Sequence, residues 1–139
     1  MSVDSAGMAA RLGIKPGMVV QELGWDEDAD EDLRDSIVEA IGSDMVDEDT
    51  DEVADVVLLW WREDDGDLFD ALTDTLTSLA DDGVVWLLVP KSGRPGHVEP
   101  GDVTEVAPTA GLSQTTSISA AKDWSGIRLV TPKTARTRR

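Results

Sequence analysis

The amino-acid sequence predicts an α/β fold: a three-layer α/β/α sandwich with a Rossmann-like, mostly parallel sheet that has helices on both faces. Two observations carry this prediction. Residues Val84 to Val89 are apolar without alternation, which is typical of a strand covered on both faces. In addition, segments with strand character alternate with segments of helical periodicity, and short links join them.

The N-terminal part of the domain is predicted to hold a strand and a helix. The strand spans residues 18–23, follows a Pro-Gly turn and ends at Gly24. The helix spans Glu31 to Ile41, because apolar residues recur there at helical spacing, and Gly42 ends it. Acidic residues at the start of this helix interact favourably with its dipole. Residues 43–51 leave room only for a brief edge strand.

The centre of the chain is predicted to form a strand over residues 53–61, then a helix, then the apolar strand described above. In the helix, leucines recur at spacings of four and three and so share one face: Leu68, Leu72, Leu76 and Leu79. Asp67 is placed to cap the start of this helix, and Gly83 to take the left-handed position after its end.

A third, short helix is predicted near residue 102. Asp102 and Glu105 have the spacing of a capping box at a helix start. Pro108 falls inside the apolar pattern that follows, so the helix is short or kinked. Gly111 closes it.

Two further strands complete one domain. Residues 115–120 and 127–130 are expected to pair as an antiparallel hairpin at the C-terminal edge of the sheet, with a turn at residues 123–126. The domain spans residues 11–131, which suits a chain of 139 residues. Residues 1–10 are expected to be a flexible N-terminus.

The tail, residues 132–139, differs in composition from the domain. It carries four bases and no acid, and we expect it to be disordered. Its functional interpretation is a docking segment, or a phosphorylation site at Thr134 or Thr137, where phosphate would reduce the local positive charge.

The charge of the chain is strongly negative, at −17, and the acids are concentrated. Between Glu22 and Asp82 there are 24 acids, and Arg34 and Arg62 are the only bases. Such a body repels phosphate groups, which argues against direct binding of nucleic acid or of anionic membranes. The acidity then serves solubility, mimics a nucleic-acid surface, or recognises a basic protein partner.

The composition also bears on the cellular compartment. The chain has no cysteine, which excludes disulfides and cysteine metal sites. No apolar run approaches the roughly 20 residues of a membrane helix, and the N-terminus lacks the basic-then-apolar pattern of a signal peptide. The sequence therefore predicts a soluble, cytoplasmic protein.

Parts of the sequence resemble known families. Residues 12–24 resemble the opening strand of class I S-adenosylmethionine-dependent methyltransferases, residues 54–59 their fourth strand, and residues 79–89 the step into their fifth. A closer resemblance, over roughly residues 11–131, is to a family of small bacterial proteins known only as a domain of unknown function. It is carried by the short motifs Trp86-Leu-Leu-Val-Pro-Lys91, Asp102-Val103, Ala110-Gly-Leu112 and Trp124-Ser-Gly126. This resemblance implies the fold but no known activity.

The methyltransferase resemblance implies a cofactor loop after the first strand, where several glycines let the backbone approach the ligand. Gly24 matches the start of that loop, but Trp25, Asp26 and Asp28 occupy the rest and would block or repel the ligand. We therefore expect no cofactor. If a small-ligand site persists in this cleft, its lining residues would be Gly24, Trp25, Asp55, Trp60, Pro90 and Lys91.

A small anion has one candidate site. Lys91 and Arg94 follow the carboxyl end of a central strand, where ligands of open α/β sheets bind. The amides of Gly93 and Gly96 lie in the same loop. The alternative is an ordinary loop whose bases pair with the acidic body.

Metal sites and catalytic residues are not predicted. Asp26, Asp28 and Asp30 have the spacing of the first EF-hand ligands, but Glu31 stands at the glycine position and Ile37 at the bidentate acid. The single histidine of the chain has no partner histidine or cysteine for a metal.

The sequence favours a non-enzymatic cytoplasmic binding or regulatory module. Its acidic face, around Asp26, Asp28 and Asp30, would recognise a basic protein partner. The alternative is an enzyme or sensor that binds S-adenosylmethionine or a nucleotide in the degenerate methyltransferase-like cleft. A third interpretation is a homodimer formed through an edge strand.

Overall fold

The computed structural model describes residues 8–131, which form one five-stranded sheet in the order β1-β2-β3-β5-β4. The neighbours β1, β2 and β3 are parallel, whereas β5 runs antiparallel to both β3 and β4. The sequence prediction of a mostly parallel sheet with a C-terminal antiparallel hairpin is therefore confirmed. The strands are β1 Val20–Leu23, β2 Ala54–Trp60, β3 Leu79–Pro90, β4 Ser113–Ser119 and β5 Trp124–Val130.

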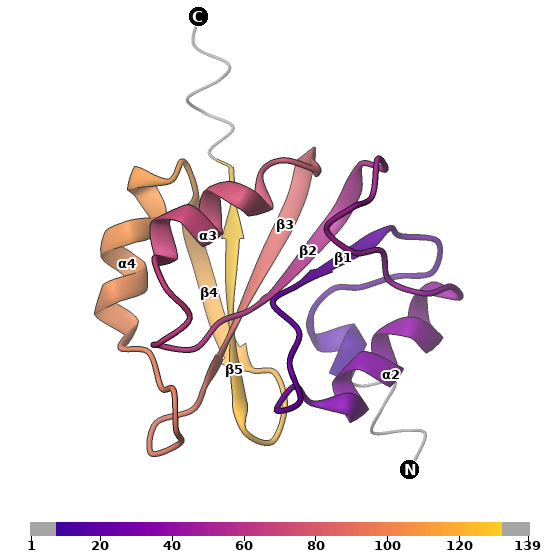
Figure 1. Ribbon diagram of the computed structural model, residues 1–139. Helices are drawn as coiled ribbons and strands as arrows, with labels where there is room; N and C mark the ends of the chain where they lie inside the picture. Colours follow the sequence, from indigo (N-terminus) through magenta and orange to yellow (C-terminus); the bar gives the residue numbers. More distant parts are fainter. Residues whose placement is uncertain (1–7, 132–139) are drawn as a thin grey trace, which may run out of the picture.

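Helices cover both faces of this sheet. Figure 1 shows α2 on one side and α3 with α4 on the other. Because side chains alternate along a strand, Leu58 and Trp60 pack in the core beneath α2, whereas Val57 and Leu59 pack beneath α3 and α4. The three-layer prediction is confirmed. The helices are α2 Glu31–Ile41, α3 Leu68–Thr75 and α4 Pro100–Thr109.

The first long helix, α2, has the predicted boundaries. Asp30 caps it, because its side chain accepts a hydrogen bond from the Leu33 N–H at 2.8 Å. Gly42 takes the left-handed conformation after its end, with φ 81°, and donates its N–H to Val38.

The central helix, α3, is shorter than predicted. Asp67 caps it as expected, accepting from the Phe69 N–H at 2.8 Å. However, α3 ends at Thr75, where the hydroxyl bonds back to the Leu72 carbonyl, and Leu79 already pairs in β3. Gly83 lies inside β3 and not at a helix end. Glycine is needed there because a Cβ would lie 2.5 Å from the Leu79 side chain.

The predicted capping box and final turn are also corrected. The helix α4 begins at Pro100, whose missing N–H suits a first helical position, so Asp102 lies in the first turn and does not cap. The residues assigned to a turn, 123–126, are mostly in β5. Gly126 is needed within this strand because a Cβ there would lie 3.1 Å from the Trp86 ring.

Of the N-terminus predicted to be flexible, residues 8–10 are described by the structure. Residues 8–11 form a helical turn in which Ala9 is buried and donates its N–H to the Ser36 hydroxyl at 3.0 Å. The brief edge strand expected within residues 43–51 is a single bridge between Val46 and Gln21. The tail and its threonines, like residues 1–7, lie outside the described residues.

Within residues 8–131, no helix has the length and apolar character needed to cross a membrane.

Candidate functional site

Most of the residues proposed for a ligand cleft lie at one end of the sheet. Gly24 directly follows β1, Trp60 ends β2, and Pro90 ends β3 with Lys91 after it. Asp55 does not join them. It stands at the start of β2, the opposite end of the same strand, and its Oδ2 accepts from the Val19 N–H at 2.9 Å.

The space between the ends of β1 and β2 is occupied by an arginine. The side chain of Arg62 is buried and donates to the carbonyl of Gly24 at 2.8 Å and of Trp60 at 3.3 Å. It also forms a two-pronged ion pair with Asp28 and a second pair with Asp65 at 3.2 Å. We call these five residues the Arg62 clamp.

Within the Arg62 clamp, Arg62 and its carboxylate partners stabilise one another's ionised forms. Burial by itself would lower the pKa of Arg62, but the hydrogen bonds to Asp28 and Asp65 outweigh it and raise the pKa. The hydrogen bond from Arg62 lowers the pKa of Asp28 below its ordinary value of 3.8. The clamp therefore holds one guanidinium between two carboxylates, and its ionised form carries one excess negative charge.

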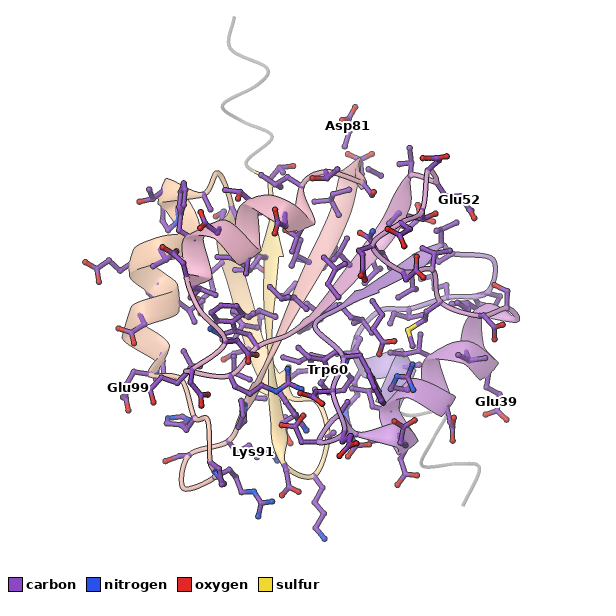
Figure 2. All side chains as sticks on the ribbon, viewed as in Figure 1. Glu39, Glu52, Trp60, Asp81, Lys91 and Glu99 are labelled. Atoms are coloured by element: carbon purple, nitrogen blue, oxygen red, sulfur yellow. The ribbon has the colours of Figure 1, made fainter. Side chains whose placement is uncertain are left out.

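Two tryptophans pack beside the Arg62 clamp. The indole of Trp60, labelled in Figure 2, is fully buried. It meets that of Trp124 edge to face, with ring centroids 4.8 Å apart. Trp60 donates its Nε1–H to Glu22 at 2.9 Å, and Trp124 donates to the Asp28 carbonyl at 3.2 Å. The guanidinium of Arg62 lies 5.2 Å from the Trp124 ring centroid, within cation–π range.

Gly24, which matches the start of a cofactor loop, packs against the backbone of β2. A Cβ at this position would lie 2.4 Å from the Trp60 carbonyl oxygen, and φ is 76°. Glycine is therefore required here by the close approach of the backbone at the ends of β1 and β2.

Trp25 does not fill the cleft. Its side chain lies at the surface, 49% exposed, and donates to Glu31 at 3.3 Å while Arg34 stands 5.5 Å from its ring centroid. Arg34 in turn binds Glu22 at 2.6 Å and Glu31 at 2.9 Å. The hydrogen bond from Arg34, followed by that from Trp25, lowers the pKa of Glu31, and the bond to Glu22 raises the pKa of Arg34.

The two bases of the anion candidate have separate partners. Lys91 donates to the Ser119 hydroxyl at 2.6 Å, and Arg94 pairs with Asp123 at 3.4 Å. The hollow of about 150 Å³ beside Arg94 is also lined by Asp28 and Asp123, whose carboxylates oppose an anion. Gly96 packs against the Arg62 side chain.

The three acids proposed for partner binding have different roles. Asp28 belongs to the Arg62 clamp and Asp30 caps α2. Asp26 is exposed, and its carboxylate accepts from the Glu27 N–H at 2.7 Å. Across residues 8–131, no group of three or more His, Asp or Glu side chains is placed to hold a metal ion.

A second hollow, of about 380 Å³, lies on the other side of β1. Its walls come from β1, β2, α3 and the segment before β2, and they include Gln21, Leu23, Glu48, Leu59, Ala71 and Asp74. Gln21 is buried and donates its Nε2–H to the Asp47 carbonyl at 3.0 Å. Its Oε1 is buried and has no hydrogen-bond partner among the described residues. We call this site the Gln21 hollow.

Sequence reasoning did not find Arg62 or Gln21. The signal for Arg62 was present, because a base alone in an acidic segment is expected to pair. Gln21 gave a weaker signal: it is the polar residue between Val20 and Leu23 that faces the apolar layer.

The comparison with protein families decides where the chain belongs. The model of the family described as "Protein of unknown function (DUF3052)" matches residues 9–133. The chain belongs to the DUF3052 family. Uncharacterized proteins of Mycobacterium bovis and of Mycobacterium tuberculosis are each 54% identical to it over 129 residues, which cover 93% of this chain and 81% of theirs.

Solved structures similar to this DUF3052 chain share its fold. The pyocyanin biosynthetic protein PhzM aligns with a TM-score of 0.65 at 14% identity, covering 92% of this chain; the chain spans 54% of PhzM. A SAM-dependent methyltransferase from Aquifex aeolicus aligns with a TM-score of 0.60 at 14% identity, over 91% of this chain and 88% of that one. The glycopeptide N-methyltransferase MtfA gives the same score and identity, over 94% and 90%. The predicted methyltransferase-like, Rossmann-like fold is confirmed.

Proposed function

We propose that this DUF3052 protein is a non-enzymatic, cytoplasmic binding module that recognises a basic protein partner through its acidic surface. One observation carries the proposal. Both arginines of the acidic segment, Arg34 and Arg62, are engaged in internal ion pairs. Neither is left to neutralise exposed carboxylates elsewhere on that segment, such as Asp44, Glu48 and Asp74.

The surface available to a partner is broad. Figure 2 places Glu39, Glu52 and Asp81 at separate points around the periphery, each directed away from the sheet. A field of one sign over a surface steers an oppositely charged partner and speeds its association. The Arg62 clamp supports the non-enzymatic part of the proposal, because its own side chains take up the space at the strand ends where ligands of such sheets bind.

The test is the binding of a fluorescent arginine- and lysine-rich peptide to the full chain, followed by anisotropy, with a glutamate-rich peptide as control. We expect saturable binding of the basic peptide that weakens by about fivefold or more when salt rises from about 50 to 200 mM. A triple substitution of exposed acids, Asp26→Asn, Asp49→Asn and Asp51→Asn, should weaken it further.

The matched control neutralises three acids at the start of α4: Glu99→Gln, Asp102→Asn and Glu105→Gln. It changes the net charge equally, but its three residues lie outside the acidic segment from Glu22 to Asp82. If both triple variants weaken peptide binding equally, net charge alone explains the binding and the acidic segment is not the recognition surface. If the peptide does not bind at low salt, the proposal is contradicted. Asp28 and Asp30 are left unchanged because both stabilise the fold.

A second candidate function is the binding of S-adenosylmethionine or a nucleotide. The observation that favours it is that Gly24, at the end of β1, also lines the Gln21 hollow. A thermal-shift and tryptophan-fluorescence titration with S-adenosylmethionine, S-adenosylhomocysteine and common nucleotides tests it. A saturable shift with one of them would support this candidate over the first.

Self-association is a further proposal. The strand β4 pairs only with β5 and forms one edge of the sheet, with most of its residues exposed. Sedimentation that finds a dimer, lost when Pro replaces Thr116, would support it, and a monomer at all concentrations would contradict it.

A further inference from the structure

We propose that the Gln21 hollow is the pocket that receives an arginine side chain of the basic partner. This inference rests on the proposed function and makes it specific, because it assigns one buried acceptor and two exposed carboxylates to a guanidinium group.

The position of Gln21 is the first step. Side chains alternate along β1, so Val20 packs beneath α2 while Gln21 and Leu23 face the layer of α3. In the sheet register Gln21 stands beside Val57, which is fully buried. A polar side chain has therefore been placed where its neighbours are apolar, and such a group is stable only if its polar atoms find partners.

Gln21 satisfies half of that requirement. Its Nε2 donates to the Asp47 carbonyl, and this fixes which end of the amide faces the segment before β2. Its Oε1 is buried and has no partner among residues 8–131. Burying a carbonyl oxygen without a hydrogen-bond donor costs free energy of folding. We therefore infer that a ligand with an N–H group donates to this atom.

The other walls of the hollow define the chemical class of that ligand. Glu48 and Asp74 are exposed carboxylates that line the same space, and neither forms an ion pair within the described residues. They favour a cation. Leu23, Leu59 and Ala71 supply an apolar wall for an aliphatic stem.

An arginine side chain fits this combination better than a lysine. The guanidinium is planar, weakly hydrated and carries five N–H donors, so it can serve a buried acceptor and two carboxylates at once. The ammonium of lysine is strongly hydrated and is more costly to bring to a buried acceptor. The volume of about 380 Å³ lies in the range of small-molecule pockets.

The experiment titrates the full chain with N-acetyl-arginine amide and follows amide signals in two-dimensional ¹H–¹⁵N spectra. We expect saturable shifts of the Gln21 side-chain amide and of the backbone at Thr77 and Ser78, which line the hollow. The uncharged analogue N-acetyl-citrulline amide should bind about tenfold more weakly, and N-acetyl-lysine amide should fall between them.

Variants locate the site. Glu48→Gln with Asp74→Asn should weaken binding of the arginine amide about tenfold, and Gln21→Met should weaken it by a similar factor. The matched control, Asp35→Asn with Glu39→Gln, removes two exposed acids from α2 on the opposite face and should change binding by less than about twofold.

The outcomes separate the two proposals. If the basic peptide binds with salt dependence but is insensitive to the variants of the hollow, the arginine pocket is wrong and the acidic-surface proposal stands. If the arginine amide shifts signals equally around all surface carboxylates, or lysine binds as well as arginine, the pocket is also overturned. If neither peptide nor arginine amide binds, both proposals fail.

Discussion

The two faces of β1 solve the problem of buried polar groups in opposite ways. At the Arg62 clamp, a buried guanidinium is surrounded by two carbonyls and two carboxylates of the same chain. At the Gln21 hollow, a buried amide oxygen has no partner within residues 8–131. At the strand ends a buried charge is therefore satisfied by groups of the chain itself, whereas the neighbouring hollow keeps an acceptor without a partner among the described residues.

The largest expected effect comes from breaking the Arg62 clamp. Arg62→Met leaves two carboxylates and two carbonyls without their donor, and we expect the free energy of unfolding to fall by about 3 kcal/mol. Urea denaturation measures it. Arg34→Met is the control, because Arg34 is more exposed and its ion pairs should contribute about 1 kcal/mol or less. A loss from Arg62→Met no larger than the control would contradict the stabilising role of the clamp.

A smaller loss is expected from Gly24→Ala. The added methyl group would meet the Trp60 carbonyl oxygen, and alanine is strained at the positive φ of this residue, so we expect about 2 kcal/mol of destabilisation. Gly13→Ala is the control, because Gly13 has a similar φ but open space around the added Cβ. Its loss of stability therefore measures the backbone strain alone. If the two variants lose equal stability, the close approach of β1 and β2 is not the cause.

Replacing Gln21 should have little effect on stability. Gln21→Met removes the bond to the Asp47 carbonyl but also removes the unsatisfied Oε1, and these changes oppose each other. We expect the free energy of unfolding to stay within about 1 kcal/mol of the unchanged protein. A loss as large as that of Arg62→Met would show that Gln21 is a structural residue and weaken the case for a binding role.

The smallest expected effect is a pH dependence of the clamp. The pKa of Asp28 is lower in the folded state, so its contribution to stability is present above the unfolded pKa and is lost as pH falls through the folded pKa. The difference in unfolding free energy between the unchanged protein and Asp28→Asn should therefore shrink as pH drops below about 4. Asp26→Asn, which removes no ion pair, provides the reference. A difference that does not change with pH would contradict this linkage.

The sequence predicted the layers of the fold because each rests on local periodicity. The apolar run Val84–Val89, the helix Glu31–Ile41 and the Asp67 cap were read from neighbouring residues and are confirmed. Glycine was less informative. Gly83 was assigned to the end of a helix and Gly126 to a turn, but both lie in strands where a neighbouring side chain leaves little room for a Cβ.

The site could not be read in the same way because it depends on long-range contacts. Arg62 reaches Asp28 across 34 residues and Gly24 across 38 residues of chain. Asp55 and Trp60 were both predicted to line the cleft, but they lie near opposite ends of β2. That Gln21 Oε1 has no partner among residues 8–131 depends on how the side chain is oriented by its bond to the Asp47 carbonyl, which cannot be read from the sequence.

The perpendicular contact of Trp60 and Trp124, at an interplanar angle of 83°, makes the packing of this corner accessible to spectroscopy. Near-ultraviolet circular dichroism, which reports fixed packing of side chains, would therefore register a loosening of this corner in unlabelled protein.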